Sequence, residues 1–260
     1  MPVKKEPNGR RSVEAETEVV GTPEQVWQAI ATGPGISSWF VPSKVEERAG
    51  GAAFSTFGPG MDSHGKITEW QPPHRYVVTT EEGPGEVASE WTVEAQAGGV
   101  CKVRVVHAWF ASSDDWDGQF EGHSFGWISF FQILQRYMQY FAGQSSSIIA
   151  LSPMTAEPDP WGRLVRPLGL DKAAPRQSFS TPPGVPELVG VVEVVNPPEW
   201  PGLLLRLEKP APALAHLFVM PMGPQTLLSI RFYLYGPKGA AAAKDVEAEW
   251  NAWLAATFQK

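Results

Sequence analysis

Apolar side chains at a spacing of three and four residues predict one long helix over residues 112–141. A first stripe contains Phe120, Trp127, Phe131, Leu134, Met138 and Phe141, and a second stripe beside it contains Phe130, Ile133, Tyr137 and Tyr140. One sheet edge does not cover an apolar face this broad. We therefore expect the first stripe to close over a sheet and the second stripe to meet the C-terminal half of the chain. The helix would then be both a lid and a wall between two related units.

Between residues 43 and 110 the pattern changes to an alternation of apolar and polar residues. This period of two is typical of strands with one buried face. Gly-Pro-Gly, Pro-Pro and Gly-Gly sequences separate the alternating segments and mark turns. We predict an antiparallel meander of six strands, over residues 44–47, 52–57, 64–70, 75–81, 86–95 and 101–110.

The N-terminal segment contains a basic tail, a strand and a helix. Residues 1–11 have no apolar pattern, and we predict a disordered tail there. Residues 12–20 alternate and indicate a strand. Thr22 suits the N-cap of the following helix and Pro23 suits its first position, and the Gly-Pro-Gly sequence at residues 33–35 should end it.

Several local sequences in this order of elements resemble a known superfamily. They are Thr22-Pro23-Glu24-Gln25-Val26-Trp27, Gly35-Ile36-Ser37-Ser38-Trp39-Phe40, Gly65 through Trp70-Gln71-Pro72-Pro73, Trp91-Thr92-Val93-Glu94 and Asp114-Asp115-Trp116-Asp117. Residues 12–142 thereby resemble the START-like helix-grip superfamily (SRPBCC), and within it the activator-of-Hsp90-ATPase-like group. The resemblance implies an α+β fold in which an antiparallel sheet wraps around a long C-terminal helix. We assign this domain to residues 12–143.

The second half of the chain repeats the first in a degenerate form. A shift of 125 places residues 52–110 on residues 177–235, with eight identities in 59 positions, most of them at or near turns. We expect strands at residues 145–151, 188–195, 203–208, 213–220 and 226–235 and a closing helix at 240–258, whereas residues 158–170 are too rich in proline for a regular helix. Residues 144–260 therefore form either a second, degenerate helix-grip domain or an extension that packs on the long helix.

Composition narrows the class of protein. The chain has 260 residues, 43% of them hydrophobic and 19% charged, which is typical of a soluble globular protein. The net charge of −7 argues against nucleic-acid binding, and no apolar run is long enough to span a membrane. We expect a cytoplasmic protein. Eleven Trp and thirteen Phe favour a roomy interior or a binding surface.

Alternation along the last two strands of the meander predicts the residues that face the long helix. Lys102 and Arg104 should face solvent, which turns Cys101 and every second residue after it inward. Together with aromatic residues near the expected mouth and on the helix, they predict an aromatic pocket with few polar groups. The candidate ligand-binding residues are Trp39, Phe40, Ser89, Trp91, Val105, His107, Trp109, Trp127, Phe131 and Leu134. The alternative is a solid core in which Trp91, Trp109 and Trp127 pack together.

Two side chains in this region could move a proton. His107 is inward on an apolar strand and could act as a general base or bind a ligand carbonyl, and Tyr137 is the second candidate. A hydrogen-bonded core histidine is the alternative role for His107. His64 and His123 are expected at the surface or in turns.

No metal or cofactor is expected. The five histidines have no metal-binding spacing. Ser112 or Ser113 is expected to cap the long helix, and Asp114, Asp115, Asp117 and Glu121 complement the positive end of its dipole. The Gly-Pro-Gly turns lack the residues of a phosphate-binding loop, and Cys101 is predicted to be a buried, inert thiol.

Three classes of function remain open at this point. The first is a soluble protein that encloses a hydrophobic or aromatic small molecule between the sheet and the long helix. The second is an enzyme of the cyclase or aromatase type that uses the same pocket with His107 or Tyr137. The third, implied by the resemblance, is a partner of Hsp90, although no Hsp90-stimulating domain is expected before the fold.

Overall fold

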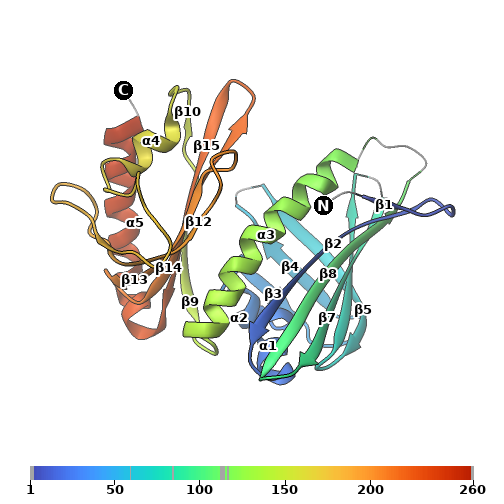
Figure 1. Ribbon diagram of the computed structural model, residues 1–260. Helices are drawn as coiled ribbons and strands as arrows, with labels where there is room; N and C mark the ends of the chain where they lie inside the picture. The colour runs from blue at the N-terminus through green and yellow to red at the C-terminus, as the bar shows by residue number, and fades with distance from the viewer. Residues whose placement is uncertain (1–2, 59, 84, 112–114, 116, 259–260) are drawn as a thin grey trace. The chain divides into compact units, whose positions relative to one another are not determined.

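The computed structural model describes residues 3–258 apart from 59, 84, 112–114 and 116, with side chains described for all of these except 118–125. The chain forms two compact units that divide between Gly143 and Gln144. Each unit contains one antiparallel sheet and ends, or nearly ends, in a long helix (Figure 1).

The first unit contains an eight-stranded sheet with the order β1-β2-β8-β7-β6-β5-β4-β3. Its strands are β1 (Lys4–Lys5), β2 (Arg10–Val20), β3 (Ser43–Val45), β4 (Ala52–Thr56), β5 (Asp62–Gln71), β6 (Arg75–Glu82), β7 (Gly85–Gln96) and β8 (Val100–Phe110). Its helices are α1 (Pro23–Ala31), α2 (Gly33–Ile36) and α3 (Asp117–Tyr140). The meander of six strands followed by a long helix is confirmed.

Helix α3 packs along β2 (Figure 1). Phe120 of its first apolar stripe lies outside the described side chains. Phe131, Leu134 and Met138 are at most 5% exposed on the helix. On the sheet, alternate residues of β8 from Cys101 to Val105 are fully buried. Helix and sheet therefore share one apolar core, as the two periodicities predicted.

The prediction of a disordered N-terminal tail is wrong for its described part. Lys4 and Lys5 pair with Ser12 and Arg11 as strand β1. Arg11 itself is only 8% exposed and donates to both carboxylate oxygens of Asp117, at 2.8 and 2.6 Å. The tail is ordered because a backbone hairpin and a partly buried ion pair hold it, and neither has an apolar pattern that a sequence could reveal.

Helix α1 begins as predicted. The Thr22 side chain accepts a hydrogen bond from the Gln25 backbone, and the Gln25 side chain accepts one from the Thr22 backbone, which is a complete capping box. The Gly-Pro-Gly sequence at residues 33–35 does not simply end this helix. Thr32 ends α1 and caps α2, which starts at Gly33. Proline at the first turn of a helix loses no intrahelical hydrogen bond, and this explains why the sequence can begin a helix as well as break one.

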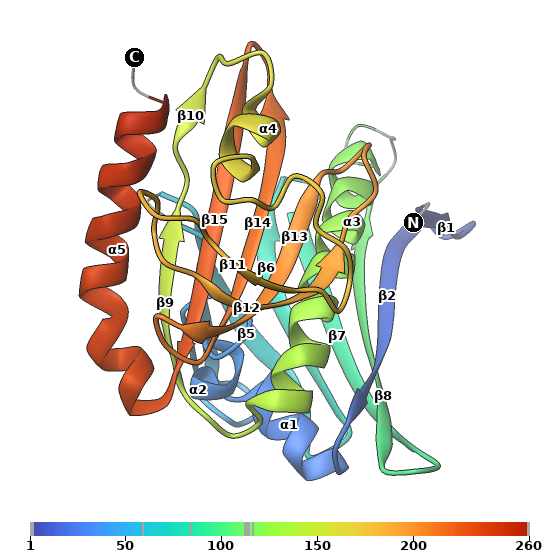
Figure 2. The same cartoon turned by 60° about the vertical axis from the view of Figure 1, so that its left-hand side comes forward.

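The second unit repeats this plan around a separate sheet (Figure 2). Its strand order is β10-β15-β14-β13-β12-β11, and β9 also pairs with β15. The strands are β9 (Ser146–Leu151), β10 (Met154–Thr155), β11 (Ser178–Ser180), β12 (Val189–Val195), β13 (Gly202–Lys209), β14 (Ala213–Met222) and β15 (Gln225–Tyr235), with helices α4 (Pro160–Val165) and α5 (Gly236–Phe258). In both units the first long strand pairs with the last, so the tandem repeat is confirmed.

Two details of the predicted repeat need correction. The segment at residues 158–170 contains the short helix α4, which Asp159 caps and Pro160 begins. The repeat is also not free of gaps. β15 follows β8 at a shift of 125, but the β7–β8 turn has three residues (Gln96 pairs with Val100) and the β14–β15 turn has two (Met222 pairs with Gln225). Inward residues of β14 therefore follow those of β7 at a shift of 126.

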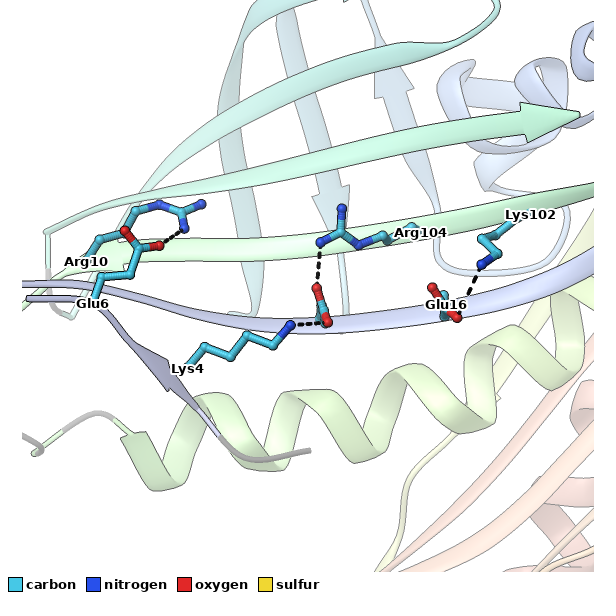
Figure 3. Close-up of polar contacts among 7 residues, drawn as sticks. Lys4, Glu6, Arg10, Glu16, Lys102 and Arg104 are labelled. Atoms are coloured by element: carbon cyan, nitrogen blue, oxygen red, sulfur yellow. Dashed lines mark hydrogen bonds and ion pairs between the residues drawn. The ribbon is translucent and has the colours of Figure 1, made fainter.

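The outer face of the first sheet, away from α3, is polar (Figure 3). Arg104 donates to Glu14 at 2.5 Å, Lys4 also pairs with Glu14, and Lys102 lies 3.6 Å from Glu16. The hydrogen bond from Arg104 and then that from Lys4 lower the pKa of Glu14. Such exposed ion pairs add little to the free energy of unfolding, and their charges favour a solvent-exposed outer face. No described helix is long and apolar enough to cross a membrane.

Candidate functional site

Aromatic side chains from three segments meet between the first sheet and α3. The Trp127 ring, on α3, lies 5.1 Å from Phe40, 5.1 Å from Trp91 on β7 and 5.6 Å from Phe131. Trp91 also contacts Phe131 at 6.2 Å. These four residues, which we call the aromatic cluster, were all among the predicted ligand-binding residues. The strand period points Trp91 inward and the helical period points Trp127 and Phe131 inward, whereas Phe40 lies in the segment between α2 and β3 and is brought to them by the tertiary fold.

A polar chain crosses this apolar region. The Trp127 Nε1–H group donates to His107 Nε2 at 2.6 Å, and His107 Nδ1 lies 2.8 Å from Ser89 Oγ. Ser89 and His107 are directly paired on β7 and β8. We call these three side chains the Ser89–His107–Trp127 chain. Both ring nitrogens of His107 thus have polar partners, and the predicted alternative of a hydrogen-bonded core histidine describes its immediate environment.

The direction of these hydrogen bonds follows from the chemistry of the indole. Trp127 Nε1–H can only donate, so His107 Nε2 must accept and carries no proton. A neutral imidazole with a bare Nε2 carries its proton on Nδ1, which then donates to Ser89 Oγ. Exchanging the ring orientation would place carbon atoms against both partners, so the two contacts together fix the orientation and the tautomer of His107.

Ser89 and His107 remain half-buried although they face α3. Their neighbours on the same strand faces are closed off, with Val87 and Val105 at 0% exposure and Trp91 at 8%. Val78, which pairs with Ser89 on β6, is also half-buried. The inner face of the sheet is therefore accessible around the polar chain and closed on either side of it.

Other predicted site residues take structural positions. Trp39 is 1% exposed and donates from Nε1 to the Ala29 carbonyl at 2.9 Å, so it anchors α1 rather than standing at a mouth. Trp109 packs with Val13 and Val87 in a small separate group. Trp109 is therefore not part of the aromatic cluster. Val105 and Leu134 are fully buried between the sheet and the helix.

Tyr137 is separated from His107. Its hydroxyl accepts a hydrogen bond from the Gly143 backbone at 3.1 Å and bonds Ser38. Burial raises the pKa of Tyr137. Ten residues of helix separate it from Trp127, about 15 Å at 1.5 Å per residue. The structure therefore does not assemble His107 and Tyr137 into one site.

The second stripe of α3 has partners inside its own unit. Phe130 contacts the Phe40 ring at 4.4 Å, and Tyr137 bonds Ser38. Tyr140 is 38% exposed. The expectation that this stripe meets the second half of the chain stays a prediction. The sequence did not show that residues after α2 fold back onto the helix.

The remaining candidate residues show no arrangement for catalysis or metal binding among the described residues. His64 is exposed on the outer face beside Phe54. Burial, and then the nearby Glu24 carboxylate, raises the pKa of Cys101, whose thiol donates to the Gly21 carbonyl. Among the described residues, no cluster of His, Cys, Asp and Glu has the makings of a metal site. His123, Glu121, Ser112, Ser113 and Asp114 lie outside the described residues or side chains.

Asp117 has a partner that sequence reasoning missed. It was expected to complement the helix dipole, and it does lie in the first turn of α3. Its carboxylate also binds Arg11 of β2 and Lys5 of β1. This pairing fixes the first turn of α3 to the edge of the sheet. The one sequence feature that could have indicated this pairing was the presence of the basic residues Lys5 and Arg11 in the segment predicted to be disordered.

Solved structures that match this chain include the following three. CalU16 from Micromonospora echinospora matches with 20% identity and a TM-score of 0.43, over 54% of this chain and 83% of its own. DynU16, described as a protein in the dynemicin biosynthetic locus, matches with 18% identity and a TM-score of 0.44, over 95% of this chain and 98% of its own. The Aha1 protein from Colwellia psychrerythraea matches with 17% identity and a TM-score of 0.43, over 51% of this chain and 98% of its own.

Sequence comparison gives the family. A search of curated protein sequences gives no match. The family model described as polyketide cyclase, dehydrase and lipid transport matches residues 10–139, which span the first unit from β2 to the end of α3. The resemblance to the helix-grip superfamily is thereby confirmed. The chain belongs to the polyketide cyclase, dehydrase and lipid transport family of START-like helix-grip proteins.

Proposed function

We propose that the first unit binds a hydrophobic or aromatic small molecule between its sheet and α3. One observation carries the proposal: Ser89 and His107 are half-buried on the helix-facing side of central strands. Polar groups in such a position are normally sealed into the core. Accessible polar groups surrounded by aromatic walls are typical of small-molecule sites.

The surrounding residues support an uncharged ligand. The residues that face the helix next to the polar chain are Val78, Val87, Trp91 and Val105, and none of them carries a charge. Burying a charged ligand here would leave its charge without a counter-ion, which is costly. The description of the family, which includes lipid transport, agrees with a ligand of this kind.

Binding fits the geometry better than base catalysis. A cyclase-like reaction would need His107 to take a proton from a substrate. In this geometry Nε2 already accepts from Trp127, and Nδ1 carries a proton directed at Ser89. A base needs a bare nitrogen facing the substrate, and His107 presents none.

A fluorescent probe tests the proposal. We expect 8-anilino-1-naphthol, which has an uncharged aromatic body, to bind the full chain saturably with one site. Ser89→Phe should abolish this binding by filling the accessible inner face, whereas Thr92→Val, on the outer face of the same strand, should leave it unchanged. Circular dichroism checks that both variants fold. Absence of saturable binding, or equal binding to a folded Ser89→Phe variant, would contradict the proposal.

A further inference from the structure

We infer that the Ser89 hydroxyl is the hydrogen-bond donor that selects the ligand, so that the ligand carries an uncharged acceptor oxygen on an aromatic body. The inference rests on the proposed function and adds to it the chemical class of the ligand and the residue that recognises it.

The hydrogen bonds of the Ser89–His107–Trp127 chain run in one direction, from the indole to the hydroxyl. Trp127 donates to His107 Nε2, and the His107 Nδ1–H group consequently donates to Ser89 Oγ. The Ser89 oxygen is therefore an acceptor in this contact. Its own proton must point to another acceptor, because both groups cannot donate along the same line.

The Ser89 hydroxyl proton lies on the helix-facing side of the sheet. Among the described residues, His107 is the single hydrogen-bond partner of the Ser89 side chain. Ser89 lies on the helix-facing side of β7 and is half-buried. An oriented hydroxyl on a half-buried residue, with no second partner among the described residues, gains a hydrogen bond from an acceptor that reaches it. A ligand carbonyl, ether or quinone oxygen is such an acceptor.

The second unit supplies an internal comparison. Phe232 on β15 is equivalent to His107 on β8. Phe232 pairs with Ala215 on β14, just as His107 pairs with Ser89 on β7. The Trp250 ring of α5 lies 5.1 Å from Phe232, in the way that Trp127 lies 5.6 Å from His107. The same fold therefore forms with apolar residues at the positions equivalent to Ser89 and His107.

This comparison separates packing from recognition. Ala215 and Phe232 are both 0% exposed in the core of the second unit, whereas Ser89 and His107 are half-buried. Polar side chains at these positions are not needed to form a helix-grip core. Their presence in the first unit, in a directed hydrogen-bond chain, is explained by what Ser89 binds. Trp127 and His107 are positioning residues that act through Ser89.

A matched pair of probes tests the inference. The ketone 2-acetylnaphthalene and the hydrocarbon 2-isopropylnaphthalene have nearly the same shape and differ in the acceptor oxygen. We expect the full chain to bind the ketone about tenfold more tightly, the effect of one well-placed hydrogen bond. Affinities are measured by displacement of 8-anilino-1-naphthol.

Variants then assign the preference to Ser89. Ser89→Ala should reduce the ratio of affinities to about one, Ser89→Thr should retain it, and Thr92→Val should not alter it. Trp127→Phe removes the N–H that fixes the His107 tautomer, so it should lower the ratio although Ser89 is intact. A general loss of packing lowers the affinity for both probes alike, so it does not change the ratio of the two affinities.

Each outcome has one meaning. If neither probe binds the full chain, the proposed function fails and the inference fails with it. If both bind with equal affinity, or if Ser89→Ala keeps the preference for the ketone, the proposed function stands and the inference is overturned.

Discussion

His107 illustrates how the role of one side chain depends on its neighbours. Its place on β8 turns it inward, and that much follows from alternation along the strand. The identity of its partners does not, because Ser89 and Trp127 are 18 and 20 residues away on other elements. These partners fix the tautomer of His107 and make it a link in a chain rather than a free base.

The energy of this link can be measured by a double-mutant cycle. His107→Leu and Trp127→Phe each remove the same hydrogen bond, so their effects on the free energy of unfolding should not add. We expect a coupling of about 1 kcal/mol from urea denaturation. As a control, His64→Leu on the exposed outer face should add to Trp127→Phe within about 0.5 kcal/mol. Additive effects for His107 and Trp127 would contradict the assigned hydrogen bond.

Arg11 makes a second prediction at the residue scale. Its side chain is 9% exposed and that of its partner Asp117 is 13% exposed. Arg11→Met should lower the free energy of unfolding by about 3 kcal/mol, because among the described residues it leaves the largely buried Asp117 carboxylate with Lys5 as its one remaining ion-pair partner.

An exposed ion pair provides the control for Arg11. The side chains of Arg48 and Glu46 are 66% and 57% exposed, and Arg48→Met should change the free energy of unfolding by less than about 0.5 kcal/mol. Similar effects of the two substitutions in urea denaturation would show that the Arg11 pair is not special.

At the scale of elements, a glycine on one pair of corresponding strands leaves no room for a side chain in either unit. Gly65 on β5 and Gly190 on β12 are equivalent positions. Gly65 pairs with Thr80 on β6, and Gly190 pairs with Leu207 on β13. A methyl group on Gly65 would lie 2.5 Å from a Val78 methyl, and one on Gly190 would lie 2.1 Å from the Arg206 carbonyl oxygen. A side chain can rotate away, whereas a backbone carbonyl within a sheet cannot.

This difference predicts unequal costs for the same substitution. Gly190→Ala should lower the free energy of unfolding by about 3 kcal/mol and Gly65→Ala by about 1 kcal/mol, as measured by urea denaturation. Gly126→Ala is the control. No atom lies within 4 Å of the added methyl on α3, so the change should stabilise the helix by about 0.5–1 kcal/mol. A larger cost at Gly65 than at Gly190 would contradict the packing argument.

At the scale of the whole molecule, one fold occurs twice with two kinds of interior. The second unit has the apolar residues Ala215, Phe232 and Trp250 in its core, and the first unit has the Ser89–His107–Trp127 chain in the corresponding place. Six strands follow the same order in both units, β2-β8-β7-β6-β5-β4 and β9-β15-β14-β13-β12-β11, so the fold itself does not require the polar residues. The ligand binding that we propose is therefore assigned to the first unit.

The division of roles gives a prediction for the complete chain. Phe232→Leu, in the second unit, should lower stability by about 1 kcal/mol through imperfect repacking. It should leave the preference for 2-acetylnaphthalene over 2-isopropylnaphthalene unchanged in displacement titrations of the full chain. His107→Leu, at the equivalent position of the first unit, should remove that preference. A loss of preference in both variants would show that the units are not separable in this way.

The success of sequence reasoning varies with the range of the interaction. The strands from Ala52 to Phe110 and the cap of α1 were predicted because alternation and capping act over a few residues. The helix at Gly33 and the strand at Lys4 were missed, because a proline motif can start or end a helix and a two-residue strand has no pattern. The offset between the repeats was missed because single-residue changes in turn length leave no mark in a weak alignment.

The sequence by itself determined the inward direction of Ser89, Trp91, His107 and Trp127, since each follows from the periodicity of one element. The helix-grip fold was expected from the resemblance of local sequences to a superfamily. The duplication was one of two interpretations of the second half until the structure showed a second sheet with a closing helix. Only the tertiary structure decided which of these side chains touch. It separated Tyr137 from His107, buried Trp39 against α1 and joined Trp127 to His107. The reason is geometric: periodicity gives the face on which a residue lies, whereas hydrogen bonds depend on the registers and rotations of several elements at once.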